Sequence, residues 1–89
     1  MQFRWIDWNR GHVLEHGVEP EEAERVVQKA RPPFPQQIGE DKLVVMGRGR
    51  GDRLLQVIYI FDPDNTVFII HARPMSEREK RRYRRKTQK

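Results

Sequence analysis

Two residues near the end of the last apolar segment can carry phosphodiester chemistry. His71 and Arg73 are two positions apart, so in an extended strand their side chains project from the same face. A histidine exchanges a proton near neutral pH, and an arginine fork holds a phosphate through two hydrogen bonds. The pair therefore indicates a site that acts on phosphodiesters. The alternative is a structural pair, in which His71 is half-buried in the strand and Arg73 caps a neighbouring carbonyl.

A second polar group lies on one face of the helix expected near the N-terminus, namely Asn9, His12 and His16. The His12-x3-His16 spacing is that of a metal-binding pair. A zinc site needs a third ligand, and the chain offers neither a cysteine nor an H-E-x-x-H pattern. We therefore expect no metal and no cofactor, with both histidines at the surface or half-buried beside the sheet edge.

A glycine-rich segment, Gly-Arg-Gly-Arg-Gly-Asp at 47–52, offers backbone amides together with Arg48 and Arg50 as ligands for phosphate. It differs from a Walker loop because the element that follows is expected to be a strand and not a helix. An ordinary hairpin connection is the alternative.

These residues must be positioned by one small domain, because a chain of 89 residues supports a single core. The apolar periodicity predicts a helix over about 8–16, ended by Gly17, and a second helix that begins at Pro20. A third helix is expected to open at Ser76, with Glu79 completing a capping box. Strands are predicted at 2–5, 36–39, 42–48, 54–61 and 66–72.

The expected fold is α+β, with residues 1–89 as one domain. It consists of a small antiparallel sheet, two N-terminal helices and one basic C-terminal helix, in the order β-α-α-β-β-β-β-α or the same with one strand fewer. Residues 54–61 are apolar on both faces except for Gln56, which favours a central strand covered on both sides.

The charge is concentrated at the C-terminal end. The net charge is +5, yet residues 73–89 contain nine Arg or Lys against two Glu, a balance of +7, so residues 1–72 sum to −2. From Glu77 onward the only apolar residue is Tyr83, so this helix has little to bury. Ion pairs are expected within it, Glu77 with Arg81 and Glu79 with Arg82.

Four arginines should form a cationic ridge along that helix, which favours an anionic partner such as nucleic acid or an acidic protein. The ridge consists of Arg78, Arg81, Arg82 and Arg85. A solvated helix that only aids solubility is the alternative, and residues 84–89 are expected to be a basic tail that can be disordered.

The absence of cysteine suits a reducing compartment, and no apolar run, including 67–70, approaches the roughly 20 residues of a membrane span. A cytoplasmic location without membrane association is expected.

Several segments in order along the chain resemble the BrnT-type toxins of the RelE-like ribonuclease superfamily. These are an aromatic N-terminal segment, His16-Gly17-Val18 leading through Glu21-Glu22-Ala23 into a helix, a Gly-Arg hairpin, and Ile70-His71-Ala72-Arg73 followed by Ser76, Glu79 and Tyr83. The resemblance implies a RelE-like fold, a ribonuclease that halts translation, and a ribbon-helix-helix antitoxin as partner. Arg48, Arg73 and Tyr83 match residues of the family's basic surface.

The sequence departs from the family pattern in its first helix, where Trp8 and His12 stand in place of a Lys and an Asn, and Ile6 separates Trp5 from Asp7.

The predicted function is a metal-independent endoribonuclease. In this hypothesis the RNA 2′-hydroxyl attacks its own phosphate, with His71 or His16 as base and Tyr83 or a histidine as acid. Arg48 and Arg73 neutralise the charge of the pentavalent phosphorus. The RNA, free or on the ribosome, is held by further arginines, namely Arg50, Arg78, Arg81, Arg82 and Arg85. The alternative is a non-catalytic module that uses the same basic surface to bind RNA or a protein.

Overall fold

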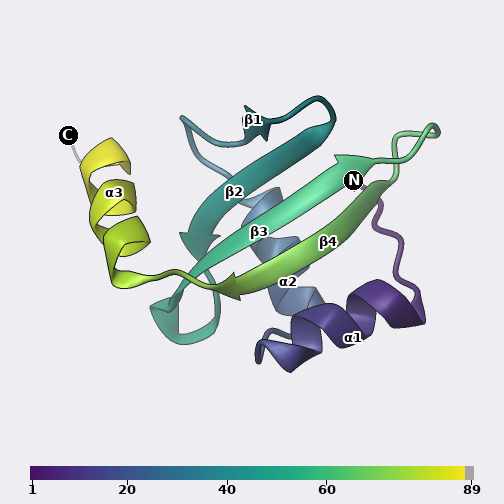
Figure 1. The fold of residues 1–89 in the computed structure, drawn as a ribbon, viewed down its shortest axis with the longest axis horizontal. Coiled ribbons are helices and arrows are strands. Elements are labelled where there is room, and N and C mark those ends of the chain that lie inside the picture. The colour runs from purple at the N-terminus through teal and green to yellow at the C-terminus, as the bar shows by residue number, and fades with distance from the viewer. Residues whose placement is uncertain (88–89) are drawn as a thin grey trace.

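A computed structural model describes residues 1–87 as one four-stranded antiparallel sheet with three α-helices (Figure 1). The spatial strand order, β1-β2-β3-β4, follows the chain. The strands are β1 (Gln36–Ile38), β2 (Lys42–Arg48), β3 (Leu54–Phe61) and β4 (Val67–Pro74). The helices are α1 (Asp7–Glu15), α2 (Pro20–Gln28) and α3 (Glu77–Thr87), and a short 3-10 turn, η1 (Arg50–Asp52), joins β2 to β3. The α+β class and the antiparallel sheet are confirmed.

The strand expected at 2–5 is wrong, and the element order is α-α-β-β-β-β-α. Phe3 makes one isolated parallel bridge to Val67, through hydrogen bonds from Arg4 N to Val67 O at 2.9 Å and from Val67 N to Gln2 O at 2.8 Å. The segment is reduced to one bridge because α1 occupies the rest of the β4 edge. The last strand also runs to Pro74, two residues beyond the expected end.

The core lies between α2 and one face of the sheet. Ala23, Val26 and Val27 of α2 are buried, and their spacing places them on one face of the helix. They pack against side chains that alternate along the three longer strands, namely Val45, Leu55, Val57, Tyr59, Val67 and Ile69. The other face of β3 carries Gln56, Ile58 and Ile60, which are only half-buried, so β3 is covered fully on one side alone.

Helix α1 runs beside the outer edge of β4 (Figure 1). Its buried Asn9 ties the helix to the edge: Nδ2 donates to Ile69 O at 2.9 Å and to Arg4 O at 3.2 Å. Asn9 Oδ1 accepts a hydrogen bond from Ile6 N at 2.7 Å, so the Asn9 side chain satisfies a backbone N–H at the start of α1. Gly17 ends this region with a φ of 74°, as expected.

The β2–β3 connection is fixed by Glu22, a side chain of α2 that is 2% exposed. Its carboxylate accepts hydrogen bonds from Arg53 Nη2 at 2.7 Å, Arg53 Nε at 2.9 Å and Arg50 N at 2.7 Å. A Cβ at Gly49 would collide with this carboxylate and with Leu55, so only glycine fits there. The connection is therefore an ordered loop.

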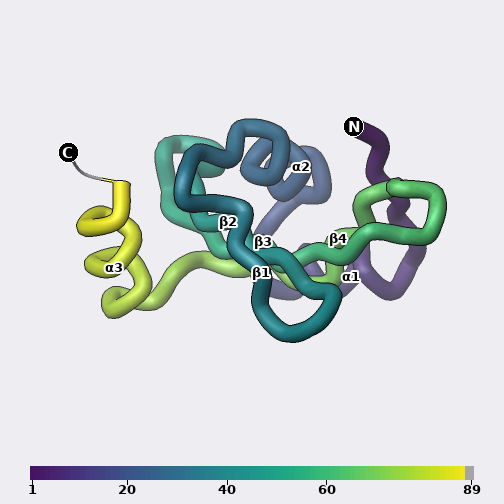
Figure 2. Tube along the Cα trace, turned by 90° about the horizontal axis from the view of Figure 1, so that it is seen from above, coloured from purple at the N-terminus to yellow at the C-terminus, as the bar shows by residue number. Residues whose placement is uncertain are grey.

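Helix α3 stands apart from α1 and α2 at one end of the molecule (Figure 2) and has no buried residue. Its capping box is confirmed, with Ser76 N to Glu79 Oε1 at 2.8 Å and Glu79 N to Ser76 Oγ at 3.1 Å. The expected ion pairs within α3 are wrong: Glu79 pairs with Arg73, and Glu77 pairs with Lys80 at 3.2 Å. Of the expected basic tail, residues 84–87 are helical, and 88–89 lie outside the described residues.

Candidate functional site

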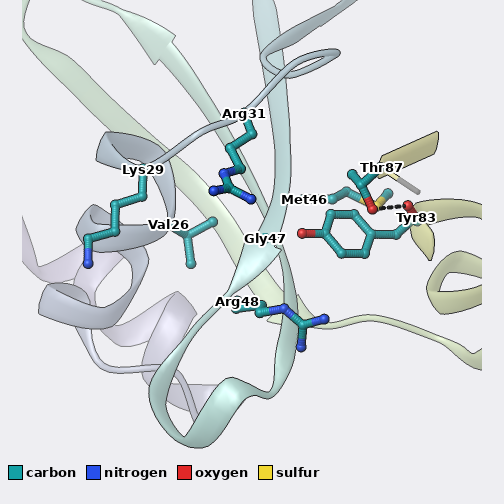
Figure 3. Close-up of a pocket in the computed structure, with 8 residues that line it drawn as sticks. All are labelled: Val26, Lys29, Arg31, Met46, Gly47, Arg48, Tyr83 and Thr87. Atoms are coloured by element: carbon teal, nitrogen blue, oxygen red, sulfur yellow. Dashed lines mark hydrogen bonds between the residues drawn. The ribbon is translucent and has the colours of Figure 1, made fainter. Parts of the chain in front are cut away.

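A basic pocket opens between the end of α2, strand β2 and α3 (Figure 3). Its volume is about 250 Å³. It is lined by Val26, Lys29, Arg31, Met46, Gly47, Arg48, Tyr83 and Thr87. Three lining residues are cationic and none is acidic. Arg31, Arg48, Tyr83 and Thr87 also line an adjoining hollow of about 540 Å³, so the basic surface is large enough for a segment of an extended anion.

Three different parts of the fold supply the three cations. Lys29 follows the last turn of α2, Arg31 begins the proline-rich segment after it, and Arg48 ends β2. Val26 of α2 packs over Gly47 of β2, since a Cβ at Gly47 would be in van der Waals contact with Val26 Cγ1 at 3.4 Å. The pocket is therefore built by the packing of α2 on β2.

The cations of the pocket are available to a ligand. Arg31 and Arg48 are exposed, and within residues 1–87 neither they nor Lys29 form an ion pair. The one hydrogen bond of the Arg48 guanidinium is a long contact of 3.4 Å to Asp52 O. Three uncompensated positive charges around one cavity attract an anion.

Tyr83 is the polar group of α3 that enters this pocket. Its ring is half-buried and stacks on buried Phe34, with centroids 6.2 Å apart and an angle of 27° between the planes. Its hydroxyl points toward β2, with Arg31 on one side and Arg48 on the other in the view of Figure 3. Thr87 Oγ1 donates to Tyr83 O at 2.9 Å. A proton donor thus stands beside two guanidinium groups.

The cationic surface continues along α3 beyond the pocket. Arg84 borders a shallower hollow together with Arg48 and Tyr83. The four predicted ridge arginines, Arg78, Arg81, Arg82 and Arg85, are all exposed. None of the four is in an ion pair with another described residue. The helix therefore presents a row of free positive charges next to the pocket.

Arg73 is held in a structural contact. Its guanidinium binds the Glu79 carboxylate through two hydrogen bonds of 2.8 and 2.7 Å, and it donates to Pro74 O at 3.0 Å. The guanidinium lowers the pKa of Glu79 to about 2, since it is the main group that stabilises the carboxylate. Arg73 therefore has a structural role, in which it binds a carbonyl and a carboxylate, and Glu79 largely neutralises its charge.

The histidines form a separate group at the β4 edge. His12 and His16 on α1 lie against His71 on β4, with ring centroids 5.8 and 5.4 Å from that of His71. Burial lowers the pKa of His71, and the charges of Arg73, His16 and His12 lower it further. His71 is half-buried, as one of its two interpretations predicted.

The predicted catalytic residues therefore fall into two groups. Arg48 is paired across the sheet with Leu54, and His71 with Ile58, four residues further along β3. With about 3.3 Å per residue and about 4.8 Å per strand, the two Cα atoms are roughly 16 Å apart. Arg48 and Tyr83 share the basic pocket, while His71 and His16 lie outside it. Arg50 does not line the pocket either; its backbone N–H holds Glu22.

Sequence reasoning missed Lys29 and Arg31. The available signal was two cations directly after the apolar stripe of α2, just before the prolines that turn the chain toward β1. No pattern within the segment indicated that Arg48 and Tyr83 would come to lie beside them.

Comparison of the chain with protein-family models, curated proteins and solved structures finds no match. The resemblance to BrnT-type toxins therefore stays a prediction. No helix among the described residues has the length and apolar character needed to cross a membrane.

Proposed function

We propose that this protein binds RNA along α3 and the basic pocket, and that it cleaves the bound strand as a toxin-like endoribonuclease. One observation carries the proposal: Arg31, Arg48 and Tyr83 line one pocket, which also includes Lys29 and has no acidic lining residue. Arginine forks suit the phosphates of a nucleic-acid backbone. The exposed arginines of α3 extend this surface beyond one nucleotide.

The pocket supports charge stabilisation and proton donation in RNA cleavage. The 2′-hydroxyl oxygen attacks the adjacent phosphorus, and the bond from phosphorus to the 5′-oxygen breaks, giving a 2′,3′-cyclic phosphate and a 5′-hydroxyl. Arg31 and Arg48 stabilise the charge that develops on the pentavalent phosphorus. Tyr83 donates its proton to the leaving 5′-oxygen and regains one from water. No step requires a metal or cofactor.

The base differs from the one that the sequence suggested. Among the described residues no histidine or carboxylate lines the pocket, and His71 is roughly 16 Å from Arg48 by strand geometry. We propose that hydroxide ion from the solvent removes the 2′-hydroxyl proton, forming water, before the oxygen attacks. The cleavage rate then rises with hydroxide concentration, and thus with pH, and shows no inflection near about 6.5, the usual pKa of histidine.

The second candidate function is a non-catalytic module that holds RNA or an acidic protein on the same surface. The pairing of Arg73 with Glu79 favours it, because this removes one of the predicted catalytic cations from reach of a phosphate. By the family resemblance, an antitoxin of the ribbon-helix-helix type is the proposed protein partner, and inhibition of translation in the cytoplasm is the proposed effect.

The binding site is tested with a short fluorescent RNA and the double variant Arg31→Ala/Arg48→Ala. A hydrogen bond to a charged group contributes about 1.5–3 kcal/mol, so each arginine should account for at least about tenfold in affinity. The matched control is Arg10→Ala/Arg25→Ala, which removes two exposed arginines of α1 and α2 outside the pocket. Equal loss in both double variants would mean that general charge, and not this pocket, binds RNA.

Cleavage is tested with Tyr83→Phe, which keeps the ring on Phe34 and removes the hydroxyl. General acid catalysis typically contributes 10²–10⁴-fold, so the variant should cleave at least about 100-fold more slowly with unchanged affinity. The measurement is single-turnover cleavage with mapping of the new 5′ ends. Binding without any product from the wild-type protein would refute the enzyme and leave the binding module.

A further inference from the structure

We propose that His12, His16 and His71 bind a divalent transition-metal ion of the Zn²⁺ class at the junction of α1 and β4. The chain has three histidines, and all three meet at this one place although they come from positions 12, 16 and 71. The expectation that no third ligand accompanies His12 and His16 is wrong, because the sheet supplies His71.

The three rings are spaced as ligands of one ion. Their nitrogen atoms all lie within 4.8 Å of one another, and the three ring centroids are 5.8, 5.8 and 5.4 Å apart. Imidazole nitrogens bound tetrahedrally at about 2.0–2.1 Å lie about 3.4 Å apart and set the ring centroids at about 5 Å. To bind one ion the nitrogens must approach by up to about 1.4 Å, and we expect rotation of the side chains to supply this movement.

The mutual orientation of the rings also fits a common ion. The three pairs of planes are inclined at 85°, 57° and 62°, so the imidazoles are not stacked on one another. Trp8, in contrast, lies parallel to His12 at 7° and to Phe68 at 6°. Two of the three histidine contacts are edge-to-face, which aromatic rings also favour without a metal, so the proposal rests on the spacing of the nitrogen atoms and not on the ring orientation.

The ligand nitrogens have one competing contact among the described residues. Glu15 Oε1 lies 4.0 Å from His12 Nδ1, which is within ion-pair distance but too long for a hydrogen bond. A small rotation would let Glu15 accept a hydrogen bond from this nitrogen and direct Nε2 toward the ion. Carboxylates commonly orient metal-binding histidines in this way.

The elements that carry the ligands are already fixed without a metal. Buried Asn9 binds the β4 carbonyl of Ile69, and buried Val13, next to His12, belongs to the core. His16 is exposed while His12 and His71 are half-buried, so the site faces solvent on one side. Three histidines with an open fourth position form the ligand set of a tetrahedral Zn²⁺ site that also holds water.

The test uses the full-length protein without a histidine tag, freed of metal by chelation, and titrated with ZnCl₂ in a calorimeter. We expect saturable binding of one ion per chain. The same protein titrated with Co²⁺ should develop the visible absorption of a tetrahedral nitrogen-ligated ion. His16→Ala, at an exposed position, and His71→Gln, which retains bulk, should each weaken Zn²⁺ binding at least tenfold. Arg10→Ala on the same helix should bind as the wild type does.

Three results would overturn the proposal. One is no saturable binding. Another is binding that survives His71→Gln, since this would reduce the site to a pair on one helix. A third is one ion per two chains, because the ligands would then come from different molecules. Circular dichroism of each variant identifies any that has lost the fold. The outcome does not depend on the RNA proposal, which involves no metal.

Discussion

The ion pair between Glu79 and Arg73 should control how firmly α3 is docked on the sheet. The helix buries no residue, and its polar attachments to β3 and β4 all pass through Glu79, which also accepts a contact from Gln56 Nε2 at 3.3 Å. Glu79→Gln removes the charge yet keeps an oxygen that can accept from Ser76 N, so the capping box survives. The substitution therefore isolates the ion pair.

The magnitude follows from the pKa of Glu79, which the fold lowers from 4.5 to about 2. At about 1.4 kcal/mol per pH unit, this difference corresponds to about 3 kcal/mol at neutral pH. The two side chains are 19% and 32% exposed, and solvent screening reduces the contribution to about 2 kcal/mol. Because α3 has no buried residue, we expect it to separate from the sheet without unfolding the core, and the loss should appear as an approximately 30-fold larger population of undocked helix.

Hydrogen exchange of the α3 amides measures this population. The Lys80 amide, bonded to Ser76 O at 2.9 Å, and its neighbours should exchange about 30-fold faster in Glu79→Gln, while the amides of β3 keep their protection. The matched control is Glu77→Gln, which removes the same charge from an exposed position of the same helix. Equal acceleration in the two variants would refute the role of Arg73, as would faster exchange in β3.

The effect has a defined pH dependence. The pKa of Glu79 is lower in the folded protein, so its contribution is fully present above about pH 4.5 and is lost as the pH falls toward 2. The ratio of exchange rates between Glu79→Gln and the wild type should be constant above about pH 5 and approach one near pH 2. A ratio that stays constant down to pH 2 would contradict the assignment of the ion pair.

Two further predictions concern the charged surface and the β2–β3 connection. Replacing Arg81, Arg82 and Arg85 by alanine should make the slope of log RNA affinity against log salt concentration shallower by about 2, at about 0.7 per phosphate contact. The slope is measured by fluorescence anisotropy. An unchanged slope would show that these three arginines do not contact the RNA. Glu22→Gln should lower the free energy of unfolding by about 2 kcal/mol in urea denaturation at pH 7. Arg53 lowers the pKa of Glu22, so this difference should diminish as the pH falls below about 4.5, and a loss under about 0.5 kcal/mol would show that the pair is dispensable.

Local patterns predicted the fold where the decisive contacts are local. The bounds of β2 and β3, the stop at Gly17 and the Ser76–Glu79 capping box all match the structure. The segment at 2–5 alternates like a strand, but its pairing depends on the β4 edge, which α1 largely occupies. The residue pattern of each segment cannot show that residues 2–5 and α1 compete for the same edge of β4.

The candidate sites were less predictable, because each joins residues distant in sequence. The sequence placed Arg48 and Tyr83 on one functional surface only through a family resemblance, while Lys29 and Arg31 went unnoticed. His71 and Arg73 do share a strand. However, Glu79 neutralises the charge of Arg73, and α1 brings His12 and His16 next to His71. Helical spacing alone suggested a metal pair, and only the packing of α1 on β4 adds the third histidine.

The weak docking of α3 bears directly on how the proposed RNA site would work. The pocket has one wall from the rigid α2–β2 unit, with Arg31 and Arg48, and another from α3, with Tyr83. A phosphate that contacts both walls binds only the docked helix, so RNA binding and docking must stabilise each other. Glu79→Gln should therefore weaken RNA binding although Glu79 is itself an anion, whereas Glu77→Gln, which lowers the negative charge equally, should strengthen binding slightly. Glu79→Gln and Glu77→Gln change the charge of the helix equally. Opposite changes in RNA affinity for these two variants would therefore show an effect of helix docking and not of simple electrostatic attraction.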